Sequence, residues 1–305
     1  MDRAAGRPAR QEARRGGRAR TGSDRDNVTA TGPGSGDPDA PPAAADVTFD
    51  AFLGGRFRLF QPRRGFRSGS DALLLGATVP ADAEGVVVDL GSGPGAIGFS
   101  VAARAPAVRV ALVDVSASAR DLVAASLARP ENAGLADRIV PVLGDVRSPP
   151  DGWDPPLGRG EAGHVLMNPP FFASETHREA AEPERRTARS RPGAGEGGGA
   201  RLSDWFAAAR RLLSPRGRLA LVMPAAALPE ILALLSRGFG AITVYPLFPR
   251  AGEPAGLVIV AARRDSRRPL ALASGLVLHG PDGSFSAEVD RVLRAGAGLP
   301  GFAWG

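Results

Sequence analysis

From about residue 49 onward, short runs of apolar residues alternate along the chain with longer amphipathic stretches. Apolar runs bounded by Gly, Pro or Asp are typical of buried strands, and apolar residues spaced three or four apart are typical of helices. This pattern predicts strands at residues 86–90, 109–114, 139–143, 163–168, 218–223, 241–247 and 256–262. It predicts helices at residues 96–104, 116–128, 202–213 and 226–235.

The regular alternation of strands and helices predicts an α/β fold with a doubly wound, mostly parallel sheet of seven strands. Ligands on such sheets bind at the carboxyl ends of the strands, near the point where the strand order reverses. Each motif described below follows a predicted strand, so we expect these motifs to form one site.

The N-terminal segment, residues 1–46, contains Arg, Gly, Pro, Ala and Asp with almost no large apolar residues. Such a segment cannot bury enough apolar surface to offset the entropy cost of ordering. We therefore expect a disordered tail at residues 1–46 and one globular domain at residues 47–305. The tail is either a nucleic-acid-binding arm or a segment without a role of its own, including one added by a misassigned start codon.

A second unusual segment, residues 183–200, combines an arginine-dense run with a glycine-rich run. Long loops inside an α/β domain are usually functional or disordered. This one directly follows the predicted active site, so we expect it to border the substrate.

Composition narrows the function classes. The chain has no cysteine, which excludes disulfides and thiolate zinc sites, and its three histidines lack metal-ligand spacing, so we expect no metal. No apolar run approaches the roughly 18 residues of a membrane helix, and the arginine-rich N-terminus lacks the hydrophobic stretch of a secretory signal, so we expect a cytoplasmic protein. All 38 basic side chains are arginine and the net charge is +6, which permits a nucleic-acid partner.

A glycine-rich loop, Asp89-Leu90-Gly91-Ser92-Gly93-Pro94-Gly95, closes the first predicted strand of the sheet and opens the first helix. Glycines at such a turn adopt positive φ and allow a ligand to approach the backbone closely. The same stretch contains a GxGxxG match at residues 93–98, which alone would indicate a nicotinamide dinucleotide. The remaining alternative is a tight turn without a ligand.

The order acid-x-Gly-x-Gly-x-Gly resembles the first motif of S-adenosylmethionine-dependent methyltransferases. That resemblance implies cofactor-binding roles for Asp89, Gly91, Ser92, Gly93 and Gly95. Asp114 ends the second predicted strand and is placed to accept hydrogen bonds from both ribose hydroxyls. Asp145 follows the third strand and resembles the acid found near the adenine amine in this superfamily; its alternative role is an ordinary turn or N-cap residue.

The tetrapeptide Asn168-Pro169-Pro170-Phe171 follows the fourth predicted strand. Two prolines stiffen the backbone and remove N–H donors, so neighbouring carbonyl oxygens are left as acceptors. The carbonyl oxygens of Asn168 would accept both hydrogens of a planar amine, and Phe171 would stack on its ring. These bonds favour a pyramidal nitrogen whose lone pair can attack a sulfonium methyl group, and no strong base is needed. The alternative is a Pro-stiffened turn.

With this tetrapeptide, the chain resembles amino-methyltransferases of the Asn-Pro-Pro-Tyr/Phe type, in the methyltransferase small domain branch. Residues 61–75 and 276–286 are also similar to segments of valine-tRNA adenine-37-N6 methyltransferases, and the resemblance covers about residues 49–297. It implies a Rossmann-like class I methyltransferase fold, with Arg67, Gly69 and Asp71 covering the cofactor pocket.

The resemblance favours transfer of a methyl group to adenine N6 in RNA, with tRNA as the expected partner. Phe172 and the arginines Arg185, Arg186, Arg189 and Arg191 are then the expected RNA contacts, as stacking and phosphate-binding groups. Release-factor glutamine N5 and rRNA guanine N2 are alternative acceptors, because relatives of the tetrapeptide serve both. More distant alternatives are a binding protein without catalysis and an NAD-binding oxidoreductase. The sequence gives no indication of the oligomeric state.

Overall fold

Two sheets organise the part of the chain that this computed structural model describes, residues 46–65, 67–170 and 199–305. The smaller is an antiparallel hairpin of β1 (Val47–Phe52) and β2 (Phe57–Pro62). The strands of the larger sheet are β3 (Gly85–Leu90), β4 (Val108–Asp114), β5 (Ile139–Leu143), β6 (Ala162–Met167), β7 (Leu213–Pro224), β8 (Phe239–Phe248), β9 (Leu257–Arg264), β10 (Ala271–Leu272) and β11 (Leu276–Val277). The expected tail, residues 1–46, lies outside the described residues except for Asp46. The arginine- and glycine-rich segment 183–200 also lies outside them, except for residues 199 and 200.

The larger sheet has the strand order β10-β8-β9-β7-β6-β3-β4-β5, with β11 also paired to β8. Strands β3 to β7 are parallel to one another, whereas β9 runs antiparallel to both β7 and β8. The seven longer strands, β3 to β9, occur where the pattern predicts them. The predicted total of seven was too low, because β10 and β11 add to the β8 edge and are too short to show an alternating pattern.

The helices are α1 (Ser70–Gly76), α2 (Ala96–Arg104), α3 (Ala117–Leu127), α4 (Ala133–Ala136), α5 (Leu202–Leu212), α6 (Leu228–Leu235) and α7 (Ala287–Ala295). Short 3₁₀ turns are found at Leu53–Gly55, Pro130–Asn132, Pro150–Gly152 and Ala225–Ala227. The four predicted helices correspond to α2, α3, α5 and α6. None of the helices in the described ranges has the length and apolar character needed to cross a membrane.

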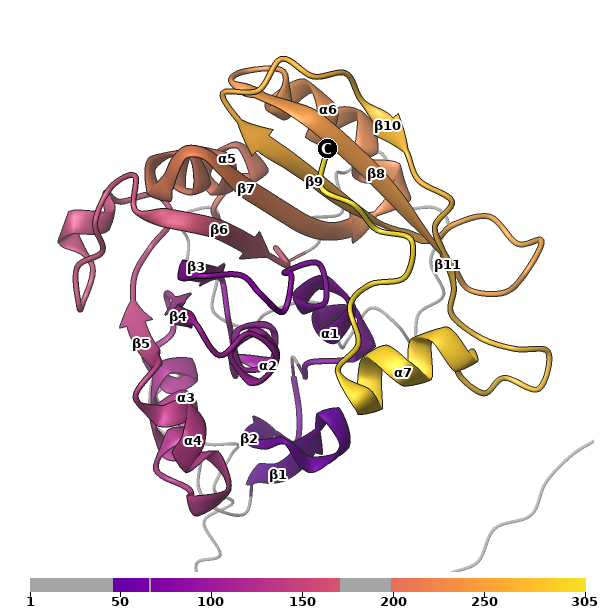
Figure 1. Cartoon of the computed structure of the whole chain (residues 1–305). Helices are drawn as coiled ribbons and strands as arrows, with labels where there is room; N and C mark the ends of the chain where they lie inside the picture. Colours follow the sequence, from indigo (N-terminus) through magenta and orange to yellow (C-terminus); the bar gives the residue numbers. More distant parts are fainter. Residues whose placement is uncertain (1–45, 66, 171–198) are drawn as a thin grey trace, which may run out of the picture. The chain divides into compact units, whose positions relative to one another are not determined.

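Alternate strand residues face opposite sides of the larger sheet, as the period of two requires. Val87 and Leu166 pack on the side covered by α1, α2 and α7, whereas Val88 and Val165 pack on the side covered by α5 and α6 (Figure 1). The chain leaves β3 toward β4 and β5 and then returns to β3's other side at β6. The strand order therefore reverses between β3 and β6, which is the position where sheets of this type bind ligands.

The β1–β2 hairpin is attached to the end of α3 by side chains distant in sequence. The buried amide of Asn132 accepts from the backbone N–H of Arg58 (3.0 Å) and donates to its carbonyl oxygen (2.7 Å). The hydroxyl of Ser126 accepts from the backbone N–H of Phe60 at 2.9 Å. These bonds satisfy hairpin backbone groups that a two-stranded sheet leaves unpaired.

Candidate active site

The glycine-rich loop connects the end of β3 to the start of α2. Gly91, Gly93 and Gly95 have φ values of 75°, 53° and 94°, in the left-handed region that glycine adopts without strain. The backbone N–H groups of Gly91 and Ser92 both donate to the carbonyl oxygen of Val113, at 2.8 and 2.9 Å. The expected positive φ angles are confirmed, and the loop is anchored to the end of β4.

Asp89 is a fully buried acid directly before this loop. Its Oδ2 accepts from the backbone N–H of Gly98 at 3.0 Å, while Oδ1 has no hydrogen-bond partner among the described residues. Burial raises the pKa of Asp89 to about 7, with a smaller contribution from the negative charge of Asp114, while the Gly98 N–H acts in the opposite direction. An acceptor atom of this kind fits a ligand that supplies a donor or a positive charge.

Gly98, the last glycine of the GxGxxG match, packs α2 closely against β4. A Cβ at this position would come within 2.8 Å of Cγ1 of Val110 and would overlap the side chain of Leu112. This glycine is therefore required by packing, so its presence does not distinguish a nicotinamide cofactor from another adenosine-containing ligand.

Asp114 ends β4 and links three parts of the site. Its buried carboxylate accepts from the backbone N–H of Gly93 at 2.8 Å through Oδ2 and from that of Ser116 at 2.9 Å through Oδ1. Ser116 in turn caps α3, because its hydroxyl accepts from the backbone N–H of Ala119. Asp114 thus lies against the glycine loop, on the strand next to β3.

Asp145 follows β5, so acids occur at the carboxyl ends of three adjacent strands. Its Oδ2 accepts a hydrogen bond from Nη2 of the Arg147 guanidinium at 2.6 Å, and its Oδ1 accepts one from the backbone N–H of Arg147 at 2.8 Å. These bonds, the side-chain ones above all, lower the pKa of Asp145. The position agrees with the prediction, although these contacts alone would also suit a turn residue.

Trp153 positions the chain around Asp145 and was not predicted as a site residue. Its indole Nε1 donates to the carbonyl oxygen of Asp145 at 3.1 Å. Its ring lies so close to Gly144 that a Cβ there would be 2.6 Å from Cδ2 of Trp153. Nothing local in the sequence indicates this contact.

Asn168 follows β6 and is adjacent to the glycine loop. In the parallel register of β3 and β6, Met167 is paired with Leu90, so the residues that follow them, Asn168 and Gly91, leave the sheet side by side. Asn168 is half-buried and Pro169 is buried. Phe171, Phe172, Arg185, Arg186, Arg189 and Arg191 lie outside the described residues.

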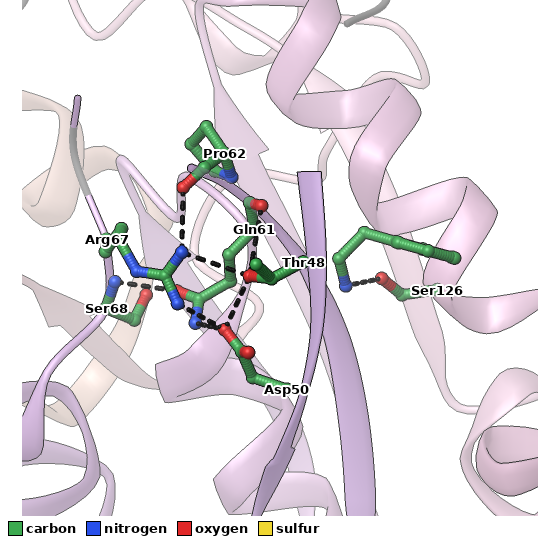
Figure 2. A network of polar contacts seen from close by, with 8 residues as sticks. Thr48, Asp50, Gln61, Pro62, Arg67, Ser68 and Ser126 are labelled. Carbon is green, nitrogen blue, oxygen red and sulfur yellow. Dashed lines mark hydrogen bonds and ion pairs between the residues drawn. The ribbon is translucent and has the colours of Figure 1, made fainter. Parts of the chain in front are cut away.

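Arg67 belongs to a polar network that joins the hairpin to the start of α1, shown in Figure 2. Its guanidinium lies 2.6 Å from Oδ2 of Asp50 and donates to the hydroxyl of Thr48 and the carbonyl oxygen of Pro62, both at 3.0 Å. Gln61 extends the network: Nε2 donates to Asp50 at 2.7 Å, and Oε1 accepts from the backbone N–H of Ser68 at 2.8 Å.

The network holds the segment from which α1 begins. Gly69 is the N-cap of α1, and Asp71 lies in its first turn. Within the described residues, the hydrogen bonds of Arg67 are all with the hairpin. Direct contacts of Arg67 and Asp71 with a cofactor stay predictions.

Trp205 is a further site residue that the sequence pattern did not single out. It projects from α5 and is buried, and its ring covers Gly91. Its indole Nε1 is buried without a hydrogen-bond partner among the described residues. The amphipathic pattern predicted that this face of α5 is buried but gave no indication of what it touches.

The donor and acceptor set suits a small cationic ligand with hydroxyl groups. The site combines a glycine loop with positive φ angles, the Oδ1 of Asp89 that has no partner among the described residues, and two further acids at neighbouring strand ends. Three carboxylates favour an ammonium or sulfonium group over a pyrophosphate. In the described part of the chain, no group of three or more His, Cys, Asp or Glu side chains could hold a metal ion.

The known proteins to which the chain is similar are methyltransferases. The family described as methyltransferase small domain matches residues 63–185. The chain is 30% identical over 245 residues to a tRNA1(Val) (adenine(37)-N6)-methyltransferase of Aeromonas hydrophila subsp. hydrophila, covering 78% of this chain and 92% of the relative. It is 33% identical over 181 residues to the protein of the same name from Porphyromonas gingivalis, covering 57% of this chain and 65% of the relative.

Two further matches concern other acceptors. A release factor glutamine methyltransferase of Gloeobacter violaceus is 34% identical over 153 residues, which is 50% of each chain. The crystal structure of a predicted O-methyltransferase from Agrobacterium tumefaciens superposes with a TM-score of 0.59 at 28% identity, covering 73% of this chain and 94% of that one.

Proposed function

Because the chain belongs to the S-adenosylmethionine-dependent methyltransferases of the methyltransferase small domain family, we propose that it methylates the N6 amine of an adenine in tRNA. The observation that carries this proposal is the position of Asn168, which leaves β6 beside Gly91 of the glycine loop. The carbonyl groups of Asn168 are thereby adjacent to the loop that would hold the methyl donor. S-adenosylmethionine supplies a methyl group made electrophilic by its sulfonium.

Each of the three acids would bind a different part of the donor. Oδ1 of Asp89, which lacks a partner among the described residues, would accept from the α-ammonium group. Asp114 would accept from the ribose hydroxyls, since a carboxylate can accept further bonds besides those from Gly93 and Ser116. Asp145 would accept from the adenine amine. The backbone at Gly91, Ser92, Gly93 and Gly95 would provide the close approach.

Asn168 and the prolines would orient the acceptor nitrogen. The side-chain and backbone carbonyl oxygens of Asn168 accept hydrogen bonds, and Pro169 and Pro170 have no N–H with which to compete. An amine with two hydrogens can satisfy both acceptors, whereas a hydroxyl has only one hydrogen to donate. This difference favours nitrogen over oxygen as the methylated atom. Positioning of this kind contributes roughly 7–11 kcal/mol in well-oriented cases.

The relatives favour adenine in tRNA as the acceptor. The relative matched over 92% of its length carries that activity in its name, whereas the glutamine methyltransferase is matched over 50%. Glutamine in a release factor is therefore the second candidate. Phe171, Phe172, Arg185, Arg186 and Arg189 remain the proposed contacts for the acceptor RNA, and a cytoplasmic location accompanies the proposal.

The test uses purified protein and a labelled methyl donor. Bulk tRNA, a release factor peptide containing the glutamine and an RNA duplex are offered in parallel. We expect label in tRNA, recovered as N6-methyladenosine, and little in the duplex, because a paired base must leave its stack at a cost of a few kcal/mol. Label in the peptide and none in tRNA would replace the RNA proposal with the glutamine one.

A further inference from the structure

A cavity of about 630 Å³ lies between α5 and α6 and is separate from the candidate active site. Its wall includes the aromatic side chains Phe206 and Phe239. Its remaining lining is dominated by five arginines, Arg159, Arg210, Arg211, Arg237 and Arg264. No acidic side chain is among the described residues that line it.

The cavity lies at the amino ends of the parallel strands, whereas the glycine loop follows the carboxyl end of β3. Gly160 precedes β6, Phe239 begins β8, and Arg264 ends the antiparallel strand β9. Asn168 follows the other end of β6, a strand of six residues that spans roughly 20 Å. The cavity is therefore not part of the cofactor or acceptor site.

Structural contacts account for only some of these arginines. Arg210 lies on the turn at Gly238 and donates to the carbonyl oxygen of Arg237 at 3.3 Å. Arg264 donates to the carbonyl oxygen of Leu213. Arg210 and Arg211 also belong to the last turn of α5, where positive charge is favourable.

Nearby acids compensate this charge incompletely. Arg159 pairs with Asp151 at 3.3 Å, in an exposed contact that water screens. Arg264 pairs with Asp265 at 3.2 Å. Among the described residues, two carboxylates thus pair with a group of five guanidinium groups from four separate segments, which leaves a local excess of positive charge that suits an anionic ligand.

We propose that this cavity binds the phosphate groups of a nucleotide, either free or within an RNA chain. Guanidinium groups form paired hydrogen bonds with phosphate oxygens. Phe206 and Phe239 supply an apolar wall for a base or ribose. The volume lies in the range of about 300–1,000 Å³ that small-molecule sites occupy.

The test measures binding with and without the exposed arginines. The variant Arg159→Gln/Arg211→Gln/Arg237→Gln removes three of the five charges, and Arg250→Gln, an exposed arginine beside Glu253 in the β8–β9 connection, is the matched control. The probes for calorimetric titration are ADP, adenosine and a single-stranded oligouridylate. S-adenosylmethionine affinity serves as the folding check, and Arg237→Gln alone replaces the triple variant if that check fails.

We expect ADP to bind the wild type and the control with equal affinity, and to bind the triple variant about tenfold or more weakly. Adenosine lacks phosphate, so its affinity for the wild type should be lower than that of ADP. Loss restricted to the oligouridylate would assign the phosphates to an RNA chain. If neither ADP nor the oligouridylate binds the variant more weakly than the control, the proposal is wrong.

Discussion

The indole of Trp205 lies directly on Gly91, so that a Cβ at residue 91 would overlap Cη2 of the ring and come within 2.6 Å of Cζ3. Gly91 is the first glycine of the loop. Trp205 belongs to α5, which comes after Asn168 along the chain. The contact therefore fixes the loop from α5. It also explains why residue 91 must be glycine for two reasons, its φ of 75° and its packing.

Gly91→Ala should therefore destabilise the protein and weaken donor binding. Left-handed φ costs a non-glycine residue about 1–2 kcal/mol, and overpacking typically costs a further 1–3 kcal/mol. Thermal unfolding measures the loss. Gly134→Ala, at a helical position with open space, should be neutral or stabilising.

The double variant Gly91→Ala/Trp205→Leu separates the two causes. Removing the indole relieves the overlap but not the φ strain, so the double variant should lose less stability than the sum of the single losses. Additive losses would mean that the contact between the two residues carries no energy.

Asp114→Asn should weaken binding of S-adenosylmethionine by about 1.5–3 kcal/mol, which is roughly 10- to 150-fold in Kd. The amide offers one acceptor where the carboxylate offers two, and its NH₂ group meets the N–H of either Gly93 or Ser116. Calorimetric titration measures the change, with Asp137→Asn, an exposed acid before β5, as the control. An unchanged affinity in folded Asp114→Asn would remove Asp114 from the donor site.

Asp89 should make the ligand-free protein less stable as the pH rises. Its pKa is raised to about 7 by burial, against about 4 in an unfolded chain. The folded state then binds the proton more tightly, so this contribution to stability is present below about pH 4 and is lost as the pH rises through about 7.

Asp89→Asn keeps the shape and removes the charge. Its melting temperature relative to wild type should increase between pH 5 and pH 8, because other titrating groups, including the buried His164, are common to both proteins. A constant difference across this range would contradict the assigned pKa. Donor affinity of the variant should fall in either case if Oδ1 holds the ammonium group.

The role of Arg67 in donor binding can be determined by comparing its substitution with that of its ion-pair partner, Asp50. If Arg67 acts by holding the segment before α1 to the hairpin, Arg67→Gln and Asp50→Asn should weaken donor binding to a similar extent. Their cost in stability should be small, about 0–1 kcal/mol, because both side chains are partly exposed. If only Arg67→Gln weakens donor binding, Arg67 contacts the cofactor itself.

Local pattern predicts the elements of the sheet well and the attached elements poorly. Strand β5 and helix α2 occur at the predicted residues because runs of small and apolar residues with clear boundaries encode them locally. The β1–β2 hairpin was not predicted, since its backbone is satisfied by Ser126 and Asn132, far along the chain. Helix α7 was also missed, although Ser286 at its N-cap and Gly296 at its C-cap were readable signals.

The site divides in the same way. The positions of Asp89, the loop glycines, Asp114 and Asn168 could be predicted because each lies at or just after the carboxyl end of a strand, and parallel strands bring these ends to one edge of the sheet. Trp205 and Trp153 could not, because their contacts with Gly91 and Gly144 arise only when α5 and the segment after β5 pack against the sheet.

Nucleoside mass spectrometry of tRNA tests directly whether the protein methylates adenine N6. The comparison is between cells with the intact gene, without it and with Asn168→Ala, whose loss of an oriented acceptor should lower the rate roughly 10²–10³-fold. Donor affinity and melting temperature of purified Asn168→Ala should stay near those of the wild type. We expect N6-methyladenosine in tRNA from cells with the intact gene only. Equal N6-methyladenosine in all three strains would contradict it.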